Sequence, residues 1–299
     1  MNTLNNLFST SSQVFVDSSF SARLYATNEL LSTPSPPRPL SQDSDMRKLR
    51  HAAAESVLQI VLTNTVDMSR FKLELLGRAD RCADLNRRAA RVTRRALGVR
   101  ASNALVGGVI GASNARRLYA ELVNGFAEQA EALAAGGVDL LWLEGFTSPR
   151  ELEAALSGCA IGAAELPIVA TVAFCQQPAL MTMLYLLHNE SRVVALGLDG
   201  SNGLAQFVEQ VGAIRSDKPL VIKGNLNALT TEMGRALSAE SLWSRFAQIC
   251  AGQGVSIIAG DESCRASDFR AMHSAVRRVQ ARKQPILAPR QAASSEIFP

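Results

Sequence analysis

Eight short apolar runs recur along the chain, and a longer segment of mixed character follows each of them. The runs are rich in β-branched residues, which is typical of strands. They are nearly continuous rather than alternating, as expected for strands covered on both faces of a parallel sheet. The pattern predicts strands over residues 13–17, 57–65, 104–113, 138–146, 166–174, 192–200, 219–225 and 255–262.

The segments between the runs predict helices. The clearest covers residues 118–137, where one apolar stripe at three- and four-residue steps consists of Leu118, Leu122, Phe126, Ala130 and Leu133. Gly136-Gly137 closes this helix in the manner of a C-cap, and Ser148-Pro149 opens the next as N-cap and first residue. Further helices are predicted over 70–98, 238–252 and 266–282.

Eight strand–helix units of roughly 30–40 residues each account for almost the whole chain. The sequence therefore predicts an α/β protein with a single (β/α)8 TIM barrel over residues 1–283. A doubly wound sheet is the main rival, but no G-x-G-x-x-G follows any predicted strand. Residues 32–45 form a proline-rich loop after the first strand, and residues 284–299, which lack periodicity, are expected to be a tail.

Composition narrows the class of protein. An apolar fraction of 47% with a net charge of only +4 excludes a disordered chain. Five cysteines are too few for a disulfide framework and indicate reduced thiols. The first residues lack a signal-peptide pattern, and no apolar stretch is long enough to span a membrane. We therefore expect a cytoplasmic protein without a membrane partner.

Arginines crowd the predicted helix 70–98 and its end. They are Arg78, Arg81, Arg87, Arg88, Arg91, Arg94, Arg95 and Arg100. They could form a surface for an anionic partner such as nucleic acid, or a solvated outer face balanced in part by Asp80 and Asp84. The solvated face is favoured, because barrel helices expose charge and the aromatic residues used for base stacking are missing. Nucleic acid is therefore disfavoured as a partner.

Candidate chemistry lies where the predicted strands end, because active sites of this fold are built there. Nearly every strand ends in polar residues, among them Asp17, Asn64, Ser113, Glu144, Cys175, Asp199, Lys223, Asn225, Asp261 and Glu262. Loops carry polar residues in any case. Asp17 and Glu144, however, directly follow strongly apolar runs, and burying such groups without purpose is costly.

Several of these segments resemble the homocysteine S-methyltransferase family, which contains betaine–homocysteine methyltransferase and the homocysteine domain of cobalamin-dependent methionine synthase. VLTNTVDMSRFKLELLG is similar to the family's TNTF segment, and AEQAEALAAGGVDLLWLEGFTSPRELEAAL to its A-GVDLL-IETF-S--EA segment. VIKGN resembles VKPN, VSIIAGDESCRASDFRAM resembles IIGGCCGTTPEHIRAL, and FVDSSFSARL stands at the LDGGMGT turn. The order and spacing match from about residue 13 to residue 282.

The resemblance implies a site for a small amino acid such as homocysteine, with a methyl donor that the sequence does not identify. Asp17 and Glu144 would bind its amino group, since a carboxylate pairs with an ammonium ion. The backbone around Ser18-Ser19 would receive its carboxylate. Asn64 and Asn225 would shape the pocket floor. Lys223 is a further candidate for substrate binding. The sequence does not determine whether the chain forms a homo-oligomer.

The resemblance also implies zinc, held by three cysteines, which lowers the pKa of the substrate thiol. Here those positions are Gly200, Asp261 and Glu262. The carboxylates are hard donors, suited to Mg²⁺ or Mn²⁺ rather than to a thiolate-activating zinc. Rebuilding a site from Asp199, Asp261, Glu262 and Cys264 would require four ligands to converge. We therefore predict no metal ligands, and the cofactor stays unknown.

Three functions follow as hypotheses. The first is a divergent S-methyltransferase that acts on a homocysteine-like acceptor without the usual zinc site. The second is a non-catalytic barrel that binds an amino acid or a partner. The third is an enzyme that uses Asp261 and Glu262 as catalytic residues, for general acid–base chemistry or for a hard metal. A nucleophilic Cys175 would need a base as its partner. The histidines fall in predicted helices, so the sequence does not indicate a Cys–His pair.

Overall fold

The chain folds into a closed barrel of eight parallel strands, which neighbour one another in chain order. The structure is a computed structural model that describes residues 7, 13–17, 58–97, 104–200, 204–211, 214, 216–261 and 263–283. The strands are β1 (Val14–Asp17), β2 (Ile60–Leu62), β3 (Leu105–Gly111), β4 (Leu140–Phe146), β5 (Ile168–Val172), β6 (Val193–Asp199), β7 (Leu220–Lys223) and β8 (Ile257–Gly260). The predicted (β/α)8 barrel is confirmed, with each strand shorter than its apolar run.

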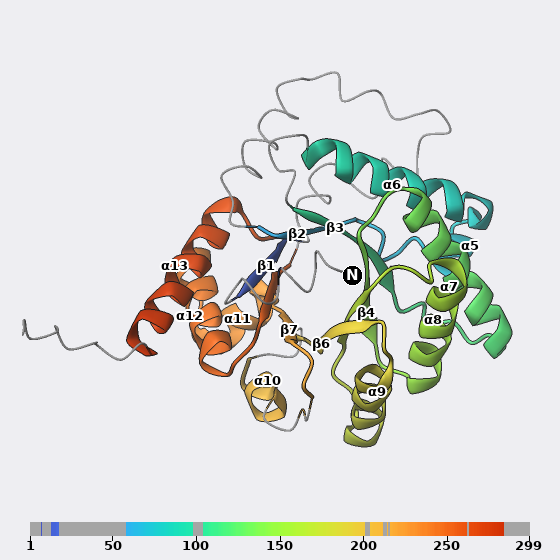
Figure 1. Cartoon of the computed structure of the whole chain (residues 1–299). Helices are drawn as coiled ribbons and strands as arrows, with labels where there is room; N and C mark the ends of the chain where they lie inside the picture. Colours follow the sequence, from blue (N-terminus) through green and yellow to red (C-terminus); the bar gives the residue numbers. More distant parts are fainter. Residues whose placement is uncertain are drawn as a thin grey trace, which may run out of the picture.

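Helices surround the strands (Figure 1). They are α5 (Arg70–Glu74), η1 (Ala79–Arg81), α6 (Cys82–Leu97), α7 (Tyr119–Ala135), α8 (Pro149–Gly162), α9 (Gln177–Asn189), α10 (Leu204–Val211), α11 (Leu226–Met233), α12 (Ala239–Gly252) and α13 (Ala266–Lys283). In Figure 1, α12 and α13 lie on the opposite side of the barrel from α7 and α8. Among the described helices, none has the length and apolar character to cross a membrane. The predicted loop 32–45 and tail 284–299 lie outside the described residues.

One helix prediction was wrong, because the segment 70–98 is broken after Glu74. Gly77 has a left-handed φ of 66°. Its N–H donates to Glu74 O (2.9 Å), and the N–H of Arg78 donates to Leu73 O (2.8 Å). These are the two hydrogen bonds of a Schellman motif, which ends a helix at a glycine. The chain restarts as η1 and α6, so the first helix of this unit is short.

The apolar residues form two layers, one inside the barrel and one between strands and helices. The inner layer consists of Val14, Val16, Ile60, Leu62, Leu105, Val109, Leu140, Trp142, Val169, Ala195, Val221, Ile257 and Ala259. Side chains alternate between the two sides of a strand, so residues such as Phe15 and Leu143 belong to the outer layer. The inner layer closes the barrel below the strand ends.

An extra residue in β4 decides which side chains enter the barrel. Glu144 and Phe146 pair with consecutive residues of β5, so Gly145 between them is a bulge. Gly145 has a left-handed φ of 78°. Trp142 belongs to the inner layer, and Glu144, two residues further on, faces the same side. Because of the bulge, Phe146 points outward, with its ring 5.9 Å from that of Phe126.

Replacing Gly145 by alanine is expected to lower the free energy of unfolding by about 1–2 kcal/mol, because an L-residue is strained in a left-handed conformation. An added Cβ would meet nothing within 4 Å, so the loss measures backbone strain alone. Denaturant unfolding gives the value. Gly252→Ala is the matched control: that site is equally open and lies at a helix end without a left-handed φ. Equal losses at both positions would contradict the expectation.

The arginine-rich segment lies largely on α6. Arg94 pairs with Asp139 (2.5 Å) and Arg81 with Asp84 (3.1 Å). Arg91 and Arg95 are exposed. These positions agree with an outer helix face, and the choice between a solvated face and an anionic partner stays an interpretation.

Candidate functional site

An ion pair crosses the mouth of the barrel. The Nζ of Lys223, the last residue of β7, lies 2.5 Å from Oε1 of Glu144 in β4. Both side chains are 11% exposed. The structure therefore brings together two of the predicted site residues, which are 79 positions apart in the sequence.

The other carboxylate oxygen of Glu144 is the unusual atom in this pair. Oε2 is buried and has no hydrogen-bond partner within the described part of the chain. Buried polar atoms are nearly always hydrogen-bonded, because an unpartnered one costs free energy. A carboxylate oxygen can only accept, so the atom is suited to a ligand that donates a hydrogen bond, above all an ammonium group.

Three further predicted residues follow strands at the same rim of the barrel. Asp17 is the last residue of β1 and is 1% exposed. Asn64 follows β2 and is half-buried between the fully buried Thr63 and Thr65. Asn225 follows β7, where its Oδ1 accepts the N–H of Ala228 (3.0 Å) as the N-cap of α11. The predicted residues Ser18 and Glu262 lie outside the described residues.

Asp261, predicted as catalytic, has both carboxylate oxygens engaged. Oδ2 accepts the N–H of Leu226 (2.6 Å), the first residue of α11. Oδ1 accepts the N–H (2.8 Å) and the hydroxyl (2.5 Å) of Ser263. The contact with Leu226 ties the end of β8 to the start of α11, and the contacts with Ser263 hold the turn that follows β8.

The resemblance implies three zinc-binding cysteines at the positions of Gly200, Asp261 and Glu262, and the structure describes the first two of these positions. Gly200 has no side chain, and a Cβ placed there would lie 2.8 Å from the carbonyl oxygen of Lys223. Asp261 uses both oxygens as described above. Cys264 packs back on its own strand, since a Cβ on Gly260 would lie 2.4 Å from its sulfur. Among the described residues, no three His, Cys, Asp or Glu side chains gather as a metal site would require. The described residues thus do not fit a zinc–thiolate centre.

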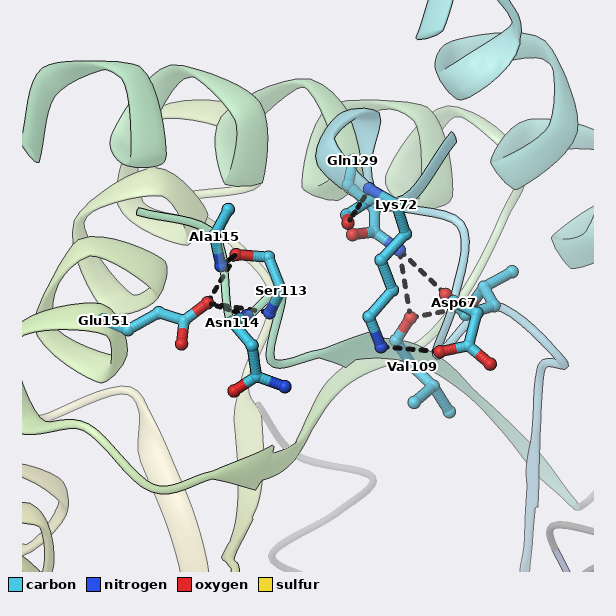
Figure 2. Close-up of polar contacts among 10 residues, drawn as sticks. Asp67, Lys72, Val109, Ser113, Asn114, Ala115, Gln129 and Glu151 are labelled. Carbon is cyan, nitrogen blue, oxygen red and sulfur yellow. Dashed lines mark hydrogen bonds and ion pairs between the residues drawn. The ribbon is translucent and has the colours of Figure 1, made fainter. Parts of the chain in front are cut away.

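A buried network that the sequence did not reveal holds the loop containing Asn64. The hydroxyl of Thr65 donates to Val109 O (2.6 Å), while Thr63 Oγ1 accepts the N–H of Val109 (2.9 Å). The two hydroxyls lie 2.7 Å apart, so Thr63 donates to Thr65, whose proton is already used. Gln129 of α7, drawn beside Val109 in Figure 2, donates to Thr65 O (3.0 Å). The sequence feature that could have indicated this network is Gln129, a polar residue next to the apolar stripe of its helix.

The loop after β3 is fixed by Glu151 of α8. Its Oε1 accepts the N–H (2.7 Å) and hydroxyl (2.5 Å) of Ser113 and the N–H of Asn114 (3.1 Å), as Figure 2 shows. Asn114 has a left-handed φ of 55°. Because β3 neighbours β4, this anchor holds the rim beside Glu144.

The five cysteines are free thiols. Burial raises the pKa of Cys82 and of Cys159 to about 12 and raises the pKa of Cys250 as well. Cys264 is fully buried. Cys175, in the segment after β5, is only partly buried, although burial raises its pKa too. Since the thiolate is the reactive form, we expect the four buried cysteines to react slowly in the folded protein.

A thiol reagent at neutral pH is therefore expected to label Cys175 first and the four buried cysteines only after unfolding. Mass spectrometry of the native and the urea-treated protein counts the labels. A Cys175→Ser variant serves as the control and should take no label in the native state. Native labelling of a buried cysteine as fast as Cys175 would contradict the burial described here.

We compared the chain with protein families, curated proteins and solved structures. A model of the family described as homocysteine S-methyltransferase matches residues 8–276. A search of curated proteins gives no match. Among solved structures, the oxidised form of the homocysteine methyltransferase MmuM from Escherichia coli aligns with a TM-score of 0.69 at 17% identity, covering 92% of this chain and 99% of that chain. Its metallated form aligns with a TM-score of 0.63 at 15% identity, covering 91% and 99%.

Proposed function

The chain belongs to the homocysteine S-methyltransferase family, and we propose that it binds homocysteine, or a similar small amino acid, as the acceptor of a methyl group. We further propose that it does so without the zinc–thiolate centre that the family resemblance implies. The observation that carries the proposal is the buried, unpartnered Oε2 of Glu144 at the barrel mouth.

The ammonium group of the amino acid is the best partner for this oxygen. It supplies the missing hydrogen bond and pairs with the carboxylate charge, and charge-assisted hydrogen bonds are the strong ones. Asp17, buried at the end of β1, adds a second carboxylate at the rim. As the resemblance implies, Asn64 and Asn225 would shape the pocket floor, and the backbone around Ser18-Ser19 would receive the substrate carboxylate. The buried threonines Thr63 and Thr65 hold the loop that carries Asn64.

A site without zinc is supported by the residues at two of the three positions where the resemblance implies cysteines. Gly200 offers no donor, and both oxygens of Asp261 accept hydrogen bonds from Leu226 and Ser263. The same contacts favour a structural role for Asp261 over general acid catalysis, because a general acid needs an oxygen available to the substrate. We also propose a cytoplasmic location, which the free cysteines support.

Calorimetric titration with homocysteine, combined with metal analysis of the purified protein, tests the proposal. We expect binding that survives dialysis against a chelator, together with far less than one zinc per chain. Alanine and methionine as ligands report whether the amino acid's ammonium suffices for binding. Stoichiometric zinc, with binding lost on its removal, would overturn the zinc-free site. Failure of every amino acid to bind would overturn the acceptor site itself.

A further inference from the structure

The loop that carries Asn64 lies mostly inside the protein, although it belongs to no helix or strand. Its buried residues are Thr63, Thr65, Met68 and Ser69. Loops usually run over the surface, because their backbone N–H and C=O groups need hydrogen-bond partners. The carbonyl groups of this loop must therefore find their partners among side chains.

Two side-chain amides from neighbouring helices supply these partners. Gln129 of α7 donates through Nε2 to Thr65 O (3.0 Å) and to Asn86 Oδ1 (3.1 Å). Asn86 of α6 donates through Nδ2 to Met68 O (2.7 Å). Both side chains are fully buried. The Oε1 of Gln129 is buried without a partner among the described residues, so the Gln129 amide is held by its donor group alone.

The two amides hold the loop at both ends of its turn. Thr65 directly follows Asn64, and the N–H of Met68 closes the turn by donating to Thr65 O (3.0 Å). Gln129 binds the start of this turn and Asn86 its end, and the hydrogen bond between the two amides couples these contacts. The position of Asn64 at the barrel rim therefore depends on side chains of α6 and α7.

We propose that Gln129 and Asn86 are positioning residues for the acceptor amino acid, because they hold the loop so that Asn64 keeps its place in the pocket. This inference rests on the proposed function, in which Asn64 shapes the pocket floor. Both amides are fully buried, so they act through the loop rather than by contact with the ligand. A binding group has to be held within about 0.5 Å of its productive position. Loss of either amide leaves a buried carbonyl with one partner fewer, and the loop shifts to regain one.

Calorimetric titration with homocysteine tests the proposal in the variants Gln129→Met and Asn86→Leu. Each substitution keeps the approximate shape of the side chain and removes the amide. We expect the dissociation constant for homocysteine to rise at least about tenfold in each variant. Asn64→Ala should weaken binding as well. Gln129→Met should then cause no further loss in the Asn64→Ala background, because a double-mutant cycle shows no second effect when one residue acts only through the other.

Leu187→Ala is the control for loss of stability. Leu187 is fully buried near the end of α9, and a helix that follows a barrel strand ends at the face opposite the strand ends that form the rim. The cavity lowers stability, but it lies away from the loop, so homocysteine affinity should equal that of wild type. Circular dichroism confirms that each variant is folded.

A folded Gln129→Met protein with wild-type affinity would overturn the inference. Equal losses of affinity in the wild-type and Asn64→Ala backgrounds would also overturn it, because the amide would then only stabilise the fold. Should Gln129→Met not fold, Asn86→Leu decides by the same two comparisons. If Asn64→Ala alone leaves the affinity unchanged, the inference fails while the acceptor site at Glu144 stands. If wild type binds no amino acid, the proposed function fails and the inference fails with it.

Discussion

Glutamine in place of Glu144 is expected to weaken homocysteine binding at least about 30-fold. The substitution removes the charge that we propose pairs with the substrate ammonium, and truncating one partner of a buried, hydrogen-bonded charge pair costs about 2–5 kcal/mol. The shape of the side chain is nearly unchanged, so the loss reports charge rather than packing. Calorimetric titration of the two proteins with homocysteine gives the ratio of dissociation constants.

Glu153→Gln provides the matched control, since Glu153 is exposed on α8 and belongs to the same strand–helix unit. Its homocysteine affinity should equal that of wild type. Circular dichroism confirms that both variants are folded. A folded Glu144→Gln protein that binds homocysteine as tightly as wild type would remove Glu144 from the binding site.

Methionine in place of Lys223 is expected to lower the free energy of unfolding by about 3–5 kcal/mol. The reason is that Oε1 of Glu144 loses its lysine partner while Oε2 already lacks one in the described chain, and breaking a buried ion pair from one side leaves an uncompensated charge. The double variant Glu144→Met/Lys223→Met should be far closer to wild type, because a buried ion pair replaced by apolar groups is often neutral.

Urea unfolding of wild type, both single variants and the double variant measures this coupling as a double-mutant cycle. The exposed pair of Lys72 and Asp67 is the control, and Lys72→Met should change stability by less than about 1 kcal/mol. A double variant less stable than either single variant would mean that the two side chains stabilise the barrel independently.

The barrel could be predicted from the sequence because the same pattern, an apolar run followed by a helical segment, occurs eight times along the chain. Each strand lies within a short apolar run, and most of these runs are followed by polar residues in the sequence. The break in helix 70–98 was missed for a local reason. Leu75 and Leu76 continue the helical composition, whereas the ending depends on the left-handed Gly77, and a single glycine within a helical pattern is ambiguous.

The sequence predicted which residues lie at the ends of the strands, but it did not predict which of them contact one another. The pairing of Lys223 with Glu144 depends on two strands that face one another only after the barrel closes. The bulge at Gly145 shifts the side on which Phe146 points, and no periodicity in the sequence encodes that shift. Asp261 was predicted as catalytic because Asp261 and Glu262 stand where the resemblance implies adjacent cysteines. The sequence pattern does not predict that its Oδ2 accepts a hydrogen bond from the distant Leu226, while its Oδ1 accepts one from the nearby Ser263.

The backbone around Gly200, where the family resemblance implies a cysteine, leaves little room for a side chain. A cysteine placed there would have its Cβ 2.8 Å from the carbonyl oxygen of Lys223, closer than a real Cβ approaches a backbone atom. The strand that would have to yield is itself held by Gly224 against Trp243. A single Gly200→Cys substitution is therefore expected to displace the backbone at the end of β7, in addition to adding a thiol at the barrel rim.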